Sequence, residues 1–438
     1  MTTGVVLMFL CLMVLLLMGY PVAFTLGAVS LFFGGYYLGF DFFTLLPLQI
    51  WGVMTNFTLL AVPLFIFMGV ILDKSGLAEA LLETMAQLCG RVRGGLALSV
   101  VVVGALLAAT TGVVGATVVT MGIIALPTML KRHYSPQLAG GTIAASGTLG
   151  QIIPPSIILI LLGDVMGVPV GQLFMAAVVP GVLLVVMFLI YILIYAWLRP
   201  EAAPSLQQKQ GENLLYKVIS TLMPPLLLVV GVLGSIFFGV ASPTESAAIG
   251  ALGAMLLALG HGKLNLENLQ SAMQLTTRLT SMVFLILIGA TAFGLVFRGM
   301  GGDRLVLDVM TGLPGGSGGF LVVSMLLIFL LGFFLDFLQI CFIVVPILAP
   351  IAATLGIDLL WLAVLIGMNL QTSFLTPPFG FSLFYLKAVA PPSVRIQDIY
   401  SGIIPFVLLQ IVTIILLVLF PEIVLWLPDL MDRIGGLS

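Results

Sequence analysis

Two short stretches of this sequence place polar and helix-breaking residues in apolar surroundings. Residues 147–156 read GTLGQIIPPS, and residues 371–380 read QTSFLTPPFG. Glycine makes a helix easy to unwind, and proline lacks an N–H donor and ends a helix. The pattern therefore predicts two discontinuous helices, whose helix-break prolines are Pro154, Pro155, Pro377 and Pro378.

The chemistry that these breaks could support is the binding of Na⁺. Freed backbone carbonyls and nearby hydroxyls are hard oxygen ligands, and they suit Na⁺ without a carboxylate, as in transporters with broken helices at the midplane. The candidate hydroxyls are those of Ser146, Thr148, Thr372, Ser373 and Thr376. An alternative is that each proline pair is a simple kink satisfied by neighbouring helices. Because the same motif occurs twice, at matching positions, we favour ion sites over simple kinks.

Composition places these breaks in a membrane. Of 438 residues, 61% are hydrophobic and 7% are charged, whereas globular proteins have about 25% charged residues. Apolar runs of ~20 residues, the length of a membrane-spanning helix, recur along the chain. They are continuous rather than alternating, which favours helices over a β-barrel. We expect an all-α polytopic protein in the lipid bilayer, and the formal charge of −2 without a basic block argues against nucleic acid.

The two breaks belong to a duplicated unit. Aligning the proline pairs also brings GGL at 94–96 onto GGF at 318–320, and GQLFMAAVVPG at 171–181 onto IQDIYSGIIPF at 396–406. Such repeats are common in secondary transporters. The units cover about 57–198 and 280–426. Each would contain a re-entrant hairpin (about 96–130 and 320–351) and a broken helix (about 138–163 and 359–386).

Counting crossings predicts that the two units have opposite orientations. The positive-inside rule, which puts lysine and arginine in cytoplasmic loops, checks this count. One face receives twelve basic residues and the other three, namely Arg298, Arg304 and Arg433. The richer face is therefore expected to be cytoplasmic. The twelve are Lys74, Arg91, Arg93, Lys131, Arg132, Arg199, Lys209, Lys217, Lys263, Arg278, Lys387 and Arg395.

The hairpin tips carry further polar residues. The first tip, ATTGVVGAT, contains Thr110, Thr111 and Gly112, and the second contains Asp336 and Gln339. An aspartate in an apolar membrane segment is costly and suggests function. The alternative role for this aspartate is to cap exposed N–H groups at the tip.

Other polar residues point to structure rather than catalysis. Glu245 follows Ser242, Pro243 and Thr244 at a helix start, which is typical of helix capping. No Walker loop, HExxH motif or Ser/His/Asp arrangement is present. We therefore expect no enzyme and no ATPase, and an ion gradient as the energy source.

The residues resemble a known family over essentially the full chain: the large membrane subunit of tripartite ATP-independent periplasmic (TRAP) transporters, in the ion-transporter superfamily. The similar segments are ASPTESAAIGAL at 241–252, GTLGQIIPPS, LGFFLDFLQICFIVVPILAPIAATLGID at 331–358, and LTPPFG at 375–380. The resemblance implies an elevator-type fold, in which a scaffold holds a mobile transport domain of hairpins and broken helices. It also implies Na⁺ as coupling ion, a small four-helix membrane subunit and a soluble periplasmic substrate-binding protein.

The resemblance further implies which residues bind sodium. One site would combine the first hairpin tip with residues from Ser146 to Gly150, and the other the second tip with residues from Thr372 to Thr376. Many relatives have serines after the glycine of the first tip, where this chain has Val113 and Val114. Backbone carbonyls would then replace side chains there. The full expected set is Thr110, Thr111, Gly112, Ser146, Gly147, Thr148, Gly150, Asp336, Gln339, Thr372, Ser373 and Thr376.

The combined expectation is a transporter of the bacterial inner membrane that takes up a small organic acid with Na⁺. The alternative is a self-sufficient ion-coupled organic anion carrier without a soluble partner. An intramembrane enzyme is disfavoured because it would need an activated nucleophile, and a channel is disfavoured because it would not need paired hairpins. The expected divisions are 1–56 (N-terminal scaffold), 57–198 (first repeat), 199–279 (linker and two helices), 280–426 (second repeat) and 427–438 (tail).

Overall fold

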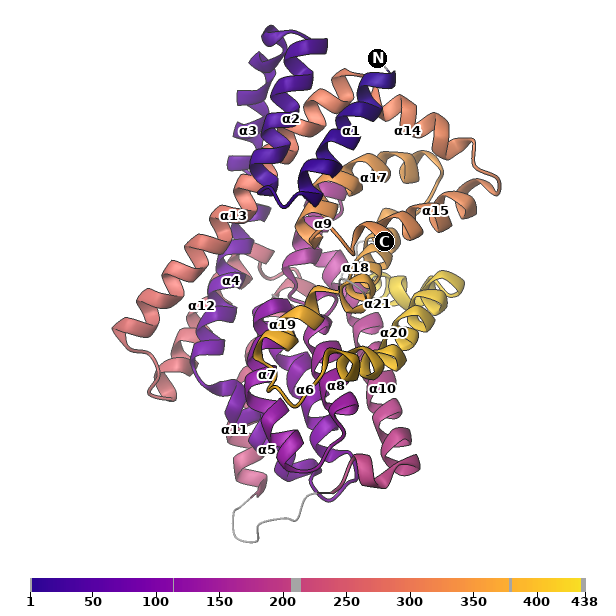
Figure 1. Cartoon of the computed structure of the whole chain (residues 1–438). Coiled ribbons are helices and arrows are strands. Elements are labelled where there is room, and N and C mark those ends of the chain that lie inside the picture. Colours follow the sequence, from indigo (N-terminus) through magenta and orange to yellow (C-terminus); the bar gives the residue numbers. More distant parts are fainter. Residues whose placement is uncertain (1, 113, 206–213, 378–379, 435–438) are drawn as a thin grey trace.

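The computed structural model describes residues 2–112, 114–205, 214–377 and 380–434. Every regular element in these ranges is helical (Figure 1). Seven helices in the described part are long and apolar enough to span a membrane, and two bent helix pairs could raise this number to nine. Backbone polar groups in hydrocarbon must be satisfied within the segment, which helices achieve. The expected all-α polytopic fold is confirmed.

The N-terminal part consists of separate helices that lie together at one end of the molecule (Figure 1). The α2 helix packs closely on α13, because a Cβ on Gly289 would lie 2.8 Å from the carbonyl oxygen of Ala23. The segment of η1 and α3 meets the next segment at a bend of 56°. The elements are α1 (Thr2–Leu17), α2 (Val22–Tyr37), η1 (Phe40–Leu45), α3 (Leu46–Met54) and η2 (Thr58–Leu60).

The next eight elements contain the first hairpin and the first broken helix. The elements are α4 (Ala61–Lys74), α5 (Leu77–Cys89), α6 (Gly95–Thr111), α7 (Val114–Lys131), α8 (Pro136–Thr148), η3 (Leu149–Gln151), α9 (Ile157–Met166) and α10 (Val170–Leu198). The start of the hairpin is joined to the segment after α10 through Tyr134, which lies between α7 and α8. The Tyr134 hydroxyl accepts from Leu96 N (3.2 Å) and donates to Pro204 O (3.0 Å).

A short connecting part follows, made of η4 (Pro200–Ala202), α11 (Leu214–Phe237) and α12 (Pro243–Gly260). The start of α12 has the helix capping expected from its sequence, with Ser242 as the N-cap and Glu245 completing a capping box. The Ser242 side chain accepts from Glu245 N, and Glu245 Oε2 accepts from Ser242 N at 2.7 Å. Thr244 instead donates to Phe57 O at 2.8 Å, which ties α12 to the start of η2, directly before α4.

The last part contains the second hairpin and the second broken helix. It begins with α13, which is 34 residues long. The elements are α13 (Leu266–Gly299), α14 (Gly302–Thr311), α15 (Gly316–Leu331), α16 (Phe337–Gln339), η5 (Ile340–Val344), α17 (Val345–Thr354), α18 (Leu359–Leu375), α19 (Phe381–Val389), α20 (Ile396–Leu419) and α21 (Glu422–Ile434).

The positions of the helices show the internal repeat that the sequence predicted. Pro377 follows Pro154 by 223 residues. The same offset moves α7 from 114–131 onto 337–354, the range that α16, η5 and α17 fill together. It also brings α8 onto α18, α9 onto α19 and α10 onto α20. In Figure 1, α5, α6 and α7 lie toward the bottom and α14, α15 and α17 toward the top. The two hairpins therefore enter from opposite ends.

The broken helices are too short to span a bilayer singly. The α9 helix has 10 residues and α19 has 9, and at 1.5 Å per residue each measures only about 15 Å against ~30 Å of hydrocarbon. Each crossing needs both halves, namely α8 with α9 and α18 with α19. The breaks between the halves consequently lie within the membrane rather than at its surface.

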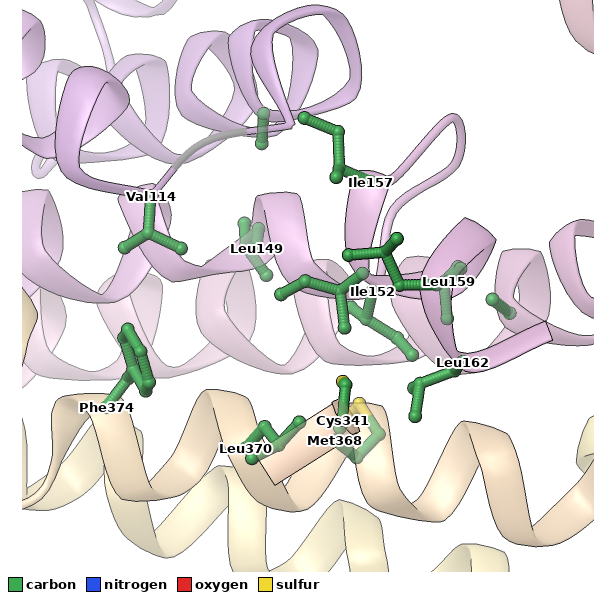
Figure 2. Close-up of a cluster of buried hydrophobic side chains, with 14 of the residues drawn as sticks. Val114, Leu149, Ile152, Ile157, Leu159, Leu162, Cys341, Met368, Leu370 and Phe374 are labelled. Atoms are coloured by element: carbon green, nitrogen blue, oxygen red, sulfur yellow. The ribbon is translucent and has the colours of Figure 1, made fainter. Parts of the chain in front are cut away.

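The two broken helices pack against each other through apolar side chains. A Cβ on Gly367 of α18 would lie 3.6 Å from Ile152 and 3.7 Å from Leu159 of the first broken helix. Figure 2 shows this buried cluster. Its labelled residues are Val114, Leu149, Ile152, Ile157, Leu159, Leu162, Cys341, Met368, Leu370 and Phe374.

The α8 and α20 helices approach each other through glycines. A Cβ on Gly402 would overlap the carbonyl oxygen of Gln137, and one on Gly141 would overlap that of Gly402. Nearby, Gln137 Nε2 donates to Asp398 Oδ1 at 2.7 Å. Small residues allow this close packing, which is a main source of helix association in lipid.

We expect Gly402→Ala to lower the melting temperature of the purified protein, because the methyl group would push α20 away from α8 at a cost of roughly 1–3 kcal/mol. Gly231→Ala on α11 is the matched control, since a Cβ there meets nothing within 4 Å. Replacing an exposed helical glycine by alanine should be neutral or stabilising by about 0.5–1 kcal/mol. Equal melting of the two variants would contradict this packing argument.

Candidate functional site

The first break begins where α8 ends. Ser135 starts α8 as its N-cap, accepting from Leu138 N, and Pro136 follows in the first turn. At the other end, the completely buried hydroxyls of Ser146 and Thr148 donate to Ile143 O (3.0 Å) and Ala145 O (2.8 Å). Each hydroxyl donates its hydrogen to the backbone, and the Thr148 oxygen also accepts from Gln410 Nε2 at 3.5 Å. Each oxygen thus keeps at least one lone pair for a cation.

The chain then leaves the helix between η3 and α9. Residues 152–156 carry the Pro154-Pro155 pair, which is joined by a cis peptide bond. The Ser156 hydroxyl donates to Gln151 O at 3.0 Å and so ties the two sides of the break. Glycines bring this region close to the hairpin, since a Cβ on Gly147 would overlap Val118.

The second break has the same local arrangement. The hydroxyls of Thr372, Ser373 and Thr376 donate to carbonyls of α18 at 2.9, 2.8 and 2.7 Å. Ser382, after the break, donates to Phe374 O at 2.9 Å. Pro377 lies in the break, whereas Pro378 falls outside the described residues.

The tip of the first hairpin lies against the first break. Thr110 donates to Leu107 O at 2.8 Å, and Thr111 is the last residue of α6. Gly112 closes the helix with a positive φ of 60°, and a Cβ there would lie 3.1 Å from Ile157 at the start of α9. Glycine is favoured at a helix C-terminus with this left-handed backbone conformation, because it has no Cβ. Val113 falls outside the described residues, and Val114 is buried at the start of α7.

The tip of the second hairpin lies near the second break. Asp336 is the N-cap of α16 and accepts from Phe337 N at 2.8 Å. The Phe337 ring stands 6.3 Å from that of Phe374 on α18. Asp336 therefore has the capping role that was one of its two expected roles. Gln339 Oε1 is buried and has no hydrogen-bond partner among the described residues.

Within each repeat, a glycine lets the hairpin approach the broken helix, but the glycine is on a different element in the two repeats. Gly150 on the first break approaches Ala108 O, with a Cβ distance of 3.3 Å. In the second repeat the glycine is on the hairpin instead, because a Cβ on Gly332 would overlap Ser373 Oγ and lie 2.7 Å from its Cβ. The offset of 223 carries Gly150 onto Ser373. Each hairpin tip thus touches its own broken helix, as the expected two-part sites require.

Two features of the region escaped the sequence-based prediction. The first is a pair of buried glutamines, Gln151 and Gln371, which occur in the two break motifs but were not assigned as ligands. The second is a cavity of about 360 Å³ between the α3–α4 bend, α9, α13 and the second hairpin. There, Asn56 Nδ2 donates to Asp164 Oδ1 at 2.5 Å. The glutamines could have been noticed as polar residues in apolar runs, but nothing in the sequence pairs Asn56 with Asp164.

Comparison with known proteins agrees with this architecture. Residues 9–423 match the family model described as the tripartite ATP-independent periplasmic transporter, DctM component. Among curated relatives, the ectoine TRAP transporter large permease protein TeaC of Halomonas elongata is 30% identical, over 96% of this chain and 97% of its own. The C4-dicarboxylate TRAP transporter large permease protein DctM of Pseudomonas aeruginosa is also 30% identical, with 88% and 89% covered.

Other similarities extend to another substrate and to a solved structure. The sialic acid TRAP transporter large permease protein SiaM of Vibrio cholerae is 28% identical, over 87% of this chain and 88% of its own. The crystal structure of the Alcanivorax borkumensis YdaH transporter matches with a TM-score of 0.65 at 16% identity, covering 97% and 98% of the two chains. This structural match supports the fold.

We expect Gly332→Ala to lower the melting temperature more than Gly150→Ala. The first change forces a methyl group onto the Ser373 side chain, whereas the second makes only a tight contact with Ala108. Overpacking of this kind costs typically 1–3 kcal/mol. In the double variant Gly332→Ala with Ser373→Gly, the space is restored and part of the lost stability should return. No rescue by the second substitution would contradict the direct contact.

Proposed function

Because the chain belongs to the DctM family of large permease components of TRAP transporters, we propose that it performs sodium-coupled uptake of a small organic acid across the bacterial inner membrane. It is a multi-pass permease rather than an enzyme. In the proposed system a soluble periplasmic protein delivers the acid, and a small four-helix membrane subunit completes the permease. The observation that carries the proposal is the pair of helix breaks, each touched by a hairpin tip.

Sodium coupling is supported by the state of the hydroxyls at both breaks. The five candidate hydroxyls at the breaks, those of Ser146, Thr148, Thr372, Ser373 and Thr376, donate to backbone carbonyls of their own helices at 2.7–3.0 Å. Their free lone pairs, with the carbonyls released at the breaks, offer the hard oxygen ligands that Na⁺ prefers. The second site would add the carboxylate of Asp336, so we propose two sodium sites of unequal charge.

An organic acid fits the helix starts that follow the breaks. The N-cap residues of α9 and α19, Ser156 and Gly380, make no side-chain capping bond. The first two N–H groups of each helix have no hydrogen-bond acceptor among the described residues, and helix N-termini attract carboxylates. Residues 147–157 and 371–381 contain no lysine or arginine. The acid would therefore be held by backbone donors and amides rather than by an ion pair.

An elevator movement is the mechanism that we propose for transport. The scaffold would comprise α1–α4 and α11–α13, and the moving part the hairpins and broken helices. The hydrogen bond from Asn56, at the α3–α4 bend, to Asp164, at the end of α9, would connect the two parts. Displacement of α9 along the scaffold would have to break this bond. A second bond between these parts, from Thr120 Oγ1 on α7 to Asp73 Oδ1 on α4 at 3.0 Å, would have to open as well when the hairpin moves.

We expect sodium to raise the melting temperature of the purified protein in detergent, compared with equal concentrations of KCl and choline chloride. A ligand that binds only the folded state stabilises it by RT ln(1 + [L]/Kd), about 2.7 kcal/mol at 100 times Kd. The variants Asp336→Ala, Ser146→Ala and Ser373→Ala should each reduce this shift and sodium-dependent uptake, with membrane insertion retained.

Ser99→Ala is the matched control for the serine variants, because Ser99 is equally buried and donates to Gly95 O at 2.8 Å near the base of the first hairpin. It should keep the full sodium shift. Unchanged sodium dependence in all three site variants would contradict the assigned sites. Uptake by the chain alone, without the other two proteins, would indicate a self-sufficient carrier.

We also expect charge reversal at Arg298 and Arg304 to weaken delivery by the periplasmic protein. Both side chains are exposed near the start of α14, on the face predicted to be outside. Arg433→Glu, an exposed arginine predicted on the same face, serves as control. Uptake should become half-maximal at a higher concentration of the binding protein in Arg298→Glu with Arg304→Glu. Delivery that is unchanged would exclude this contact surface.

A further inference from the structure

Two glutamines at the breaks have no partner for their amide groups. Gln151 and Gln371 are both 0% exposed. Neither the Nε2 nor the Oε1 atom of either side chain has a hydrogen-bond partner in the described part of the chain. A buried amide without partners is costly. Because such groups are normally paired, each unpaired one in a folded protein needs an explanation.

Both side chains belong to the region where the broken helices meet. Gln151 is the last residue of η3, directly before the first break. Gln371 lies on α18, four residues after Gly367 and three before Phe374, so these three positions share one helix face. That face points to the first broken helix, since a Cβ on Gly367 would contact Ile152. Gln371 therefore faces the same region that Gln151 borders.

The internal repeat explains why Gln371 is unpaired. The offset of 223 relates Gln371 to Thr148, and Met187 to Gln410. Thr148 of the first repeat has a partner in the second repeat, because Gln410 Nε2 donates to its Oγ1 at 3.5 Å. By sequence position, the equivalent pair is Gln371 with Met187, so an amide replaces the hydroxyl and a methionine replaces the amide donor. The Met187 sulfur accepts from Thr413 Oγ1 at 3.3 Å. A thioether is at best a weak acceptor and donates nothing. The repeat thus supplies no protein partner for Gln371.

The chemistry of an amide restricts which ligand would satisfy it. A glutamine side chain has two N–H donors and one carbonyl acceptor. Sodium would use the oxygen alone and leave the N–H groups unpaired. A plain carboxylate would use the N–H groups alone and leave the oxygen unpaired. A ligand that carries a hydroxyl or protonated nitrogen next to its carboxylate satisfies both ends.

We infer that Gln151 and Gln371 are substrate-binding residues that select an organic acid carrying a hydrogen-bond donor, such as a 2-hydroxy acid or a zwitterionic acid. This inference rests on the proposed function and names the substrate class for the same site. The amide N–H groups bind the carboxylate, and the amide oxygens accept from the donor group. An acid without the donor leaves buried amide oxygens unpaired, and sites of this kind discriminate strongly against such analogues.

The test compares Gln151→Leu and Gln371→Leu with Thr142→Val. Thr142 is a matched control because it lies on α8, is completely buried, and also has an unpaired hydroxyl in the described structure. All three variants remove an orphan polar group, so each should melt at or above the temperature of the unaltered protein in choline chloride. Only the two glutamine variants should lose acid binding.

Acid binding is measured as the added thermal stabilisation in NaCl, by titrating matched pairs of acids. The pairs are malate with succinate, lactate with propionate, and glycine with acetate. The protein is co-purified with its small membrane subunit. We expect the hydroxy or amino member of at least one pair to bind better than its partner. The glutamine variants should bind that acid roughly 10- to 100-fold more weakly, as loss of about 1.5–3 kcal/mol implies.

Three results would overturn the inference. The first is wild-type acid affinity in both glutamine variants, and the second is equal affinity for the two members of every pair. The third is loss of the sodium-specific shift in these variants without any acid, which would make the glutamines sodium ligands. The proposed function fails separately, and the inference with it, if the unaltered protein shows neither a sodium-specific shift nor sodium-dependent uptake.

Discussion

The requirement that backbone polar groups be satisfied inside the membrane determines the arrangement of this protein. Two helices are interrupted within the membrane, where an unpaired N–H or C=O group exposed to lipid costs several kcal/mol. Irregular backbone is tolerated there only when protein surrounds it or a cavity accepts it. The hairpin tips, the crossing of the broken helices and the packing of α8 on α20 all contribute to that enclosure.

Each break is enclosed by the hairpin of its own repeat, but the two hairpins present different residues to the breaks. Gly150 makes room for the first hairpin, whereas Gly332 makes room for Ser373 of the second broken helix. The first tip offers a threonine and a glycine turn, and the second offers Asp336 at a helix start. The two proposed cation sites would therefore differ in charge, although the framework around them is duplicated. The duplicated framework also produces Gln371 without the partner that its counterpart Thr148 has.

The hydroxyls at the breaks and the two glutamine amides contribute differently to the stability of the protein. The hydroxyls at the breaks are paired with backbone carbonyls, so they cost little in the absence of an ion. The amides of Gln151 and Gln371 are buried without partners in the described structure and lower its stability. Destabilised polar groups at a site are the expected cost of binding a ligand there. The partly buried hydrogen bond between Asn56 and Asp164 is a further polar contact at the cavity, and the proposed motion of α9 would have to break it.

The sequence alone determined the membrane class, the all-helical fold, the 223-residue repeat and the positions of both breaks, because these depend on local composition and on glycine and proline. The capping box of α12 was predictable for the same reason, since its partners lie three residues apart. Tertiary structure alone decided which distant side chains meet. Asn56 and Asp164 are 108 residues apart, Gly332 at the end of α15 meets Ser373 on α18, and the buried amide of Gln371 meets no partner in the described part of the chain. Whether a polar group finds a partner depends on how separate helices pack, and local sequence does not contain that information.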